Sequence, residues 1–216
     1  MRERPILFSS PMVRALLDGT KTQTRRVVSA RHLAQIDLSR APCRANWSKP
    51  MPYGDTGDRL WVRETWSYRC TASTPTAGQY MHTIGYLADD ARQTFGPMPD
   101  DGVGLPVQRA TVVGEPWQER QAYLERYWRQ WRPSIHMPRW ASRITLEVTG
   151  VRVERLQDIS IADAMAEGVV ETNANLRGLE PCMEWRCAYE DLWRQINGPD
   201  SWDANPWVWV IEFRKT

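Results

Sequence analysis

The 216-residue sequence predicts a single domain of the α+β class, with a mostly antiparallel β-sheet or barrel and flanking helices. Segments with helical spacing and segments with strand-like alternation are segregated along the chain, without the regular alternation that marks a parallel sheet. The apolar fraction of 42% is sufficient to bury a core at this length. Residues 67–110 are poor in apolar residues, so they are expected to be a loop-rich insertion in the domain rather than a second domain.

Four helices are expected from apolar residues at helical spacing. The first runs from Pro11 to Asp18, with Ser10 as its N-cap and Gly19 at its end. Ser160 is expected to cap a later helix that Gly168 ends. The other two cover residues 119–131 and 184–196.

Alternating residues predict strands at 59–66 and 143–156. The apolar stretch 207–213 predicts a strong strand, and a weaker one is expected at 81–87. In the strand at 59–66, Leu60, Val62 and Glu64 share one face. Glu64 is therefore expected to point inward, where a carboxylate needs a partner. A salt bridge to an arginine and a hydrogen bond to a base edge remain equal alternatives.

Composition excludes several classes of function. The net charge of +2 does not indicate a long nucleic-acid footprint. Cysteine spacing without C-x-x-C and three scattered histidines predict neither a zinc site nor a disulfide framework, and no cofactor is expected. No apolar stretch suits a membrane span or a secretory signal, so we expect a cytoplasmic protein without membrane partners. The four cysteines are Cys43, Cys70, Cys182 and Cys187.

The segment 19–26, Gly-Thr-Lys-Thr-Gln-Thr-Arg-Arg, is the strongest candidate for chemistry. It follows a helix end and is expected to be extended, which places alternate side chains on opposite faces. A polar helix end followed by a surface strand is the more ordinary interpretation of the spacing alone. One face would hold Thr22, Thr24 and Arg26, and the other Lys21, Gln23 and Arg25.

Four motifs together resemble the ASCH domain family, which has a PUA-like β-barrel fold. They are Gly-x-Lys-Thr-x-Thr-x-Arg, Gly-Asp-x-Leu-x-Val, Leu-x-x-Ile-Ser followed by Ala-x-Ala-Glu-Gly, and a final Trp-Val-Ile-Glu-Phe. Stretches 61–66 and 132–140 are similar to those of larger ASCH proteins from phage and prophage genomes. The resemblance covers nearly the whole chain outside about residues 67–130.

The family includes a bacterial N4-acetylcytidine amidohydrolase, and its motif positions correspond here to Lys21, Thr24 and Glu167. The resemblance therefore implies that these three residues are catalytic. Lys21 could activate the threonine hydroxyl only if its pKa falls several units below ~10.4, which burial and the neighbouring Arg25 or Arg26 would favour. Glu167 could protonate the leaving nitrogen or orient Lys21, and Arg26 could face the developing oxyanion.

Residues 131–140 combine aromatic rings, arginines and two prolines. Aromatic and guanidinium planes stack on unpaired bases. The alternative is a pocket-edge loop held by buried tryptophan packing, with His136 in a structural role. The substrate-binding candidates are therefore Arg26, Glu64, Arg132, His136, Arg139 and Trp140.

Two classes of function remain open. The first is an amidohydrolase that removes an acyl group from N4-acetylcytidine or a related modified nucleoside. The second is a non-catalytic module that binds RNA or a modified nucleobase, because proteins of one fold differ in function at the site. A nuclease ranks last for want of a metal-binding carboxylate cluster. The sequence leaves the oligomeric state and the role of the insertion open.

Overall fold

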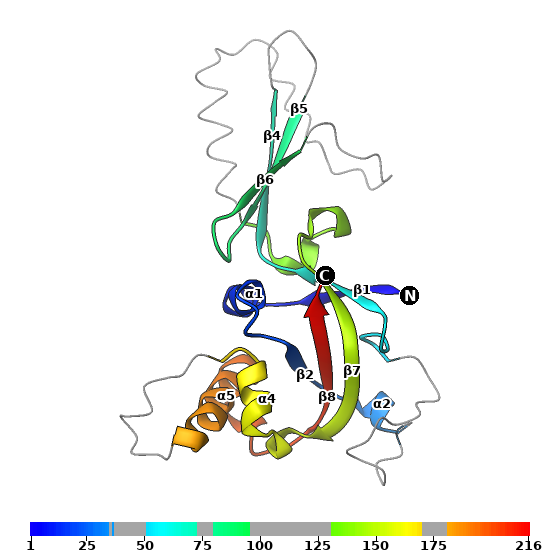
Figure 1. The fold of residues 1–216 in the computed structure, drawn as a ribbon, viewed down its shortest axis with the longest axis vertical. Coiled ribbons are helices and arrows are strands. Elements are labelled where there is room, and N and C mark those ends of the chain that lie inside the picture. Colours follow the sequence, from blue (N-terminus) through cyan, green and yellow to red (C-terminus); the bar gives the residue numbers. More distant parts are fainter. Residues whose placement is uncertain (35, 37–50, 73–79, 96–130, 170–180) are drawn as a thin grey trace. The chain divides into compact units, whose positions relative to one another are not determined.

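The structure is a computed structural model, which describes residues 1–34, 36, 51–72, 80–95, 131–169 and 181–216. Among these residues it contains two β-sheets and four α-helices, so the chain is a mixed α+β protein (Figure 1). The chain divides into two compact units, each described by itself. The first unit is Met1–Val62 with Ser142–Thr216, and the second unit is Arg63–Ala141.

The first unit contains a five-stranded sheet in the order β1-β3-β7-β8-β2. The β2–β8, β3–β7 and β7–β8 pairings are all antiparallel. No pairing that would close this sheet into a barrel is found in the described part of the chain, so the barrel stays a prediction. The strands are β1 (Glu3–Leu7), β2 (Gln23–Val27), β3 (Arg59–Arg63), β7 (Thr145–Arg155) and β8 (Trp207–Lys215).

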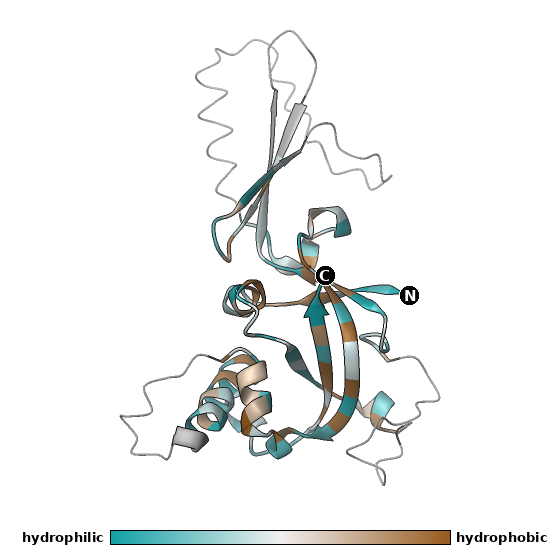
Figure 2. Ribbon diagram, viewed as in Figure 1, coloured by the Kyte–Doolittle hydropathy of each residue, from teal (hydrophilic) through white to brown (hydrophobic). Residues whose placement is uncertain are grey.

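Helices of the first unit contribute to a core against the sheet. Figure 2 shows hydrophobic residues along β7 and β8, and α4 lies beside α5 in Figure 1. Ala164 of α4, Tyr189 of α5 and Val208 of β8 belong to one buried cluster. This packing holds the end of α4 near the start of β2. The helices are α1 (Ser10–Leu17), α2 (Ala30–Leu33), α4 (Ile161–Ala166) and α5 (Pro181–Asn197), with short 3-10 turns η4 (Leu156–Asp158) and η6 (Pro199–Ser201).

The second unit has its own small sheet, in the antiparallel order β4-β5-β6. It also has a small buried cluster that includes Trp66, Tyr86 and Met137. The described residues of the predicted insertion at 67–110 belong to this unit. Its elements are β4 (Trp66–Ala72), β5 (Tyr80–Tyr86), β6 (Arg92–Phe95), and the 3-10 turns η2 (Ser134–His136) and η3 (Arg139–Ala141).

Helix ends follow the sequence closely. The predicted N-cap at Ser10 is wrong by one residue, because α1 begins at Ser10 and its N-cap is Ser9, which makes no side-chain cap hydrogen bond. The residue after the C-cap, Gly19, has a φ of +76°. The predicted cap of α4 is confirmed, because the Ser160 side chain accepts a hydrogen bond of 3.1 Å from the main-chain N–H of Asp163. The helix predicted at 184–196 is confirmed and begins earlier, at Pro181. The helix predicted at 119–131 lies outside the described residues except for its last position.

The strand predicted at 59–66 is wrong in extent, because the chain leaves one sheet and enters another. β3 pairs with β7 as far as Trp61, whereas Trp66 pairs with Tyr86 in the second unit. Trp66 also forms an isolated bridge with Arg132, with main-chain hydrogen bonds of 2.7 and 3.2 Å. The alternating sequence pattern continues from residue 59 to 66, so it does not indicate where the strand changes its pairing partner.

Candidate functional site

Lys21 and Glu167 meet at the junction of β2 and the end of α4. Their main chains form an isolated antiparallel bridge. The Lys21 Nζ donates hydrogen bonds of 2.7 Å to the Glu167 Oε2 and of 2.7 Å to its main-chain oxygen. The Lys21 side chain is 0% exposed and that of Glu167 4%. The structure therefore brings together two residues that the family resemblance implies are catalytic.

Gly168 allows this close approach of the two segments. Its φ is +74°, a conformation that glycine adopts without a Cβ penalty. A Cβ at this position would lie 2.8 Å from the Cβ of Ala15 and 2.8 Å from the Cβ of Lys21. The glycine that ends α4 is therefore also required for the contact between α1, β2 and the Glu167 turn.

Arg25 makes a second contact with Glu167. Its Nη1 donates to the Glu167 Oε1 at 3.2 Å. Its Nε and Nη2 donate to the Glu154 Oε1 at 3.1 and 2.6 Å, and the Nη2 lies 3.2 Å from the Asp163 Oδ2. The predicted alternation of faces accounts for this placement, since Lys21 and Arg25 both contact Glu167. Arg25 was not among the residues that the sequence predicted for the site.

Arg152 of β7 completes the set of charges. Its Nε donates to the Glu154 Oε2 at 2.9 Å and its Nη2 to the Asp163 Oδ1 at 2.9 Å, and its Nη1 pairs with Glu212. Buried charges are costly unless they are paired. The charge network consists of four buried residues, Lys21, Arg25, Glu154 and Glu167, and of the half-buried Arg152 and Asp163.

Burial lowers the pKa of Lys21 below its ordinary value of 10.5. The carboxylate of Glu167 opposes this change, while the positive charges of Arg26 and Arg25 reinforce it. Burial and the charge of Glu167 also raise the pKa of Tyr189 well above 10.0, so its hydroxyl stays protonated. The neutral amine of Lys21 is therefore available at a lower pH than that of an exposed lysine, as a general base requires.

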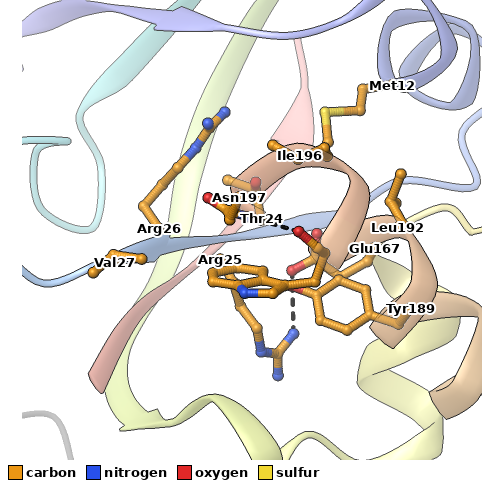
Figure 3. A pocket seen from close by; sticks show the side chains of 11 residues that line it. Met12, Thr24, Arg25, Arg26, Val27, Glu167, Tyr189, Leu192, Ile196 and Asn197 are labelled. Atoms are coloured by element: carbon orange, nitrogen blue, oxygen red, sulfur yellow. Dashed lines mark hydrogen bonds and ion pairs between the residues drawn. The ribbon is translucent and has the colours of Figure 1, made fainter. Parts of the chain in front are cut away.

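A cavity of about 70 Å³ is lined by Glu167, the partner of Lys21, whereas Lys21 itself is not among the lining residues (Figure 3). Thr24 and Glu167 line it together, and Val27 and Ile196 are half-exposed at its wall. Its volume corresponds to about five water molecules, so it suits a small group rather than a whole nucleoside. Further lining residues are Met12 of α1, Arg25 and Arg26 of β2, and Tyr189, Leu192, Trp193 and Asn197 of α5.

α5 contributes a face that the sequence analysis predicted as helical but did not assign to the site. The lining residues Tyr189, Trp193 and Asn197 are spaced four apart, so they lie on one side of the helix. That spacing was visible in the sequence, but nothing local indicated that it faces β2. Arg26, by contrast, was predicted as a substrate-binding residue and does line the cavity. Its Nη2 donates a hydrogen bond of 2.6 Å to the main-chain oxygen of Leu7.

The remaining candidates belong to the second unit. Glu64 is 1% exposed, so its predicted burial is confirmed, although it lies between β3 and β4 and not in a strand. Arg132 is exposed, and its guanidinium lies 5.4 Å from the Trp66 ring centroid. Trp140 packs edge-on against Trp66 with ring centroids 5.9 Å apart. This contact agrees with the alternative interpretation, a loop held by tryptophan packing. The other two candidates, His136 and Arg139, are exposed.

Comparisons with family models, with curated proteins and with solved structures give no match. In the described ranges, no group of three or more histidine, cysteine, aspartate or glutamate residues could hold a metal ion. Cys187 is a free thiol, and the side chains of the other three cysteines lie outside the described residues. Of the helices that the structure describes, none has both the length and the apolar character to cross a membrane.

Proposed function

We propose that this chain is an ASCH-type protein of the PUA-like fold, and that it is a cytoplasmic amidohydrolase of N4-acetylcytidine or a related modified nucleoside. One observation carries the proposal: the buried Lys21 amine is hydrogen-bonded to Glu167, which lines a cavity together with Thr24. These are the three residues that correspond to the catalytic motif, and they come from segments 146 positions apart.

The proposed reaction proceeds through an acyl-enzyme. The Thr24 Oγ attacks the acyl carbon while the neutral Lys21 amine accepts the hydroxyl proton. The bond from the acyl carbon to N4 breaks, and the proton passes to the leaving nitrogen, with Glu167 orienting Lys21. Arg26 stabilises the negative charge on the acyl oxygen. Water then cleaves the threonine ester, which releases the carboxylic acid and restores the Thr24 hydroxyl.

The cavity supports an acyl group as the part of the substrate that enters. Its volume of about 70 Å³ is small beside the roughly 300–1,000 Å³ of sites that enclose whole drug-sized ligands. Val27 and Ile196 are 49% and 52% exposed at its edge and offer apolar surface to a planar base. A free nucleoside also agrees with the net charge of +2.

The alternative is a binding module for RNA or a modified nucleobase without catalysis. The exposed Arg132, His136 and Arg139 of the second unit are the observation that favours it. In that case the cavity would hold a base substituent without a reaction.

The test is the release of cytidine and acetate from N4-acetylcytidine by the purified protein, followed by chromatography. Lys21→Ala and Thr24→Ala are each expected to abolish the release. Thr22→Ala is the matched control, because Thr22 is exposed and Thr24 is the only threonine of the motif that is expected to act as the nucleophile. Full activity in either of the first two variants would remove the assignment, and no release by the wild type would favour the binding module.

The pH dependence of the reaction provides a second check on the role of Lys21. Because the neutral amine is the reactive form, kcat/KM is expected to rise with pH through a midpoint below 10.5. A rate that falls as pH rises through this range would contradict Lys21 as the base.

A further inference from the structure

The carboxylate of Glu167 is divided between two buried cations. Its Oε2 accepts from the Lys21 Nζ at 2.7 Å, and its Oε1 accepts from the Arg25 Nη1 at 3.2 Å. Both cationic side chains are 0% exposed. Each oxygen therefore has its own partner, and the orientation of the carboxylate depends on both.

Contacts with three carboxylates hold the Arg25 guanidinium in this position. Two of its nitrogens donate to the Glu154 Oε1, at 3.1 and 2.6 Å, and Asp163 lies 3.2 Å away. Arg152 holds the second oxygens of both carboxylates at 2.9 Å. Arg25 also lines the cavity, but each of its three guanidinium nitrogens already contacts a carboxylate, so its influence on the site passes through Glu167.

We propose that Arg25 is a positioning residue that holds the Glu167 carboxylate in place and weakens the electrostatic attraction between this carboxylate and the Lys21 amine. The effect on Lys21 follows from the charges alone, whatever the substrate. Only its catalytic consequence rests on the proposed function.

The groups that bear on the Lys21 amine come from three segments. Glu167 follows α4, Arg25 and Arg26 belong to β2, and the Phe8 ring centroid lies 5.7 Å from the Nζ. Without Arg25, one repulsive charge is removed and Glu167 acts on Lys21 alone. Both changes favour the ammonium form, so the pKa of Lys21 rises and less of the amine is neutral at a given pH.

The experiment is a direct titration of Lys21. The chain has only three lysines, Lys21, Lys49 and Lys215, so protein labelled with ¹³C at the lysine ε-carbon gives three signals. Lys21→Met identifies the relevant one. In Arg25→Gln the midpoint of that signal is expected to shift to higher pH, because one repulsive charge is lost. An unchanged or lower midpoint in the folded variant would overturn the proposal.

A second variant keeps the test decisive if Arg25→Gln does not fold. Arg25→Gln with Glu154→Gln removes one positive and one negative charge and allows an amide pair in place of the ion pair. The same rise is expected, because Glu154 is not among the groups that shift the pKa of Lys21 most. Arg214→Gln in β8, which breaks the exposed pair with Glu147 of β7, is the control and should leave the midpoint unchanged.

Kinetics separate this inference from the proposed function. If the wild type hydrolyses N4-acetylcytidine, the rising limb of kcat/KM in the double variant is expected to move to higher pH, with activity recovered there. A purely structural role for Arg25 would instead lower activity equally at every pH. If the wild type does not hydrolyse this compound, the proposed function fails, whereas the titration still decides the role of Arg25.

Discussion

Substitution of Gly168 by alanine tests whether the close approach of three segments stabilises the site. The new methyl group would lie 2.8 Å from the Cβ atoms of Ala15 and Lys21 and 3.3 Å from the Lys21 Cα. These atoms are main-chain or first side-chain atoms, so no rotation of a flexible side chain relieves the contact. The turn that carries Glu167 must therefore move away from Lys21.

The expected loss of stability has two parts. An alanine at a φ of +74° costs roughly 1–2 kcal/mol in backbone strain. Overpacking against Ala15 and Lys21 adds about 1–3 kcal/mol. The free energy of unfolding is thus expected to fall by about 2–5 kcal/mol in Gly168→Ala.

Gly19→Ala is the matched control, because its φ of +76° is nearly the same and nothing lies within 4 Å of the added Cβ. It carries the strain without the overpacking, and the reduced entropy of the unfolded chain affects both variants alike. Urea unfolding followed by tryptophan fluorescence measures the two losses. Equal losses, within about 0.5 kcal/mol, would refute the steric argument.

Two further predictions concern α4. Ser160→Ala is expected to lower the free energy of unfolding by about 1 kcal/mol, whereas Ser9→Ala, at an N-cap without a side-chain hydrogen bond, should have little effect; equal losses in urea would contradict the cap. Burial alone would raise the pKa of Asp163, but Arg25 and Arg152 lower it below 3.8. Its stabilisation is therefore present above 3.8 and lost as pH falls through the folded-state pKa. Asp163→Asn should flatten the acid limb of stability measured by urea unfolding, and an unchanged limb would contradict this.

Local patterns accounted for much of the fold. The serine and glycine at the ends of α4 predicted its bounds within a residue, because caps depend on hydrogen bonds over three or four positions. The alternation in β7 predicted that strand, since one of its faces is largely in the core, and the apolar run in β8 predicted a strand that is buried on both faces from Val208 to Ile211. The break at Glu64 and Thr65 was missed, because it arises from a change of pairing partner and not from the sequence around it.

The candidate site was predictable only as separate pieces. The motif around Lys21 and Thr24 and the Glu-Gly end of α4 were each visible, and the family resemblance linked them. The contacts of Arg25 with Glu154, 129 positions away, had no local signal. Neither did the wall that Tyr189 and its neighbours on α5 contribute to the cavity.

The sequence by itself determined both ends of α4, the position of β7 and the two alternating faces of the segment from Lys21 to Arg25, but not which face is buried. These features depend on backbone conformation and on the periodicity of neighbouring residues. Only the tertiary structure decided that Lys21 loses its contact with water and shares Glu167 with Arg25. Burial and charge pairing depend on packing between distant segments, and they set the pKa of the amine on which the proposed chemistry depends.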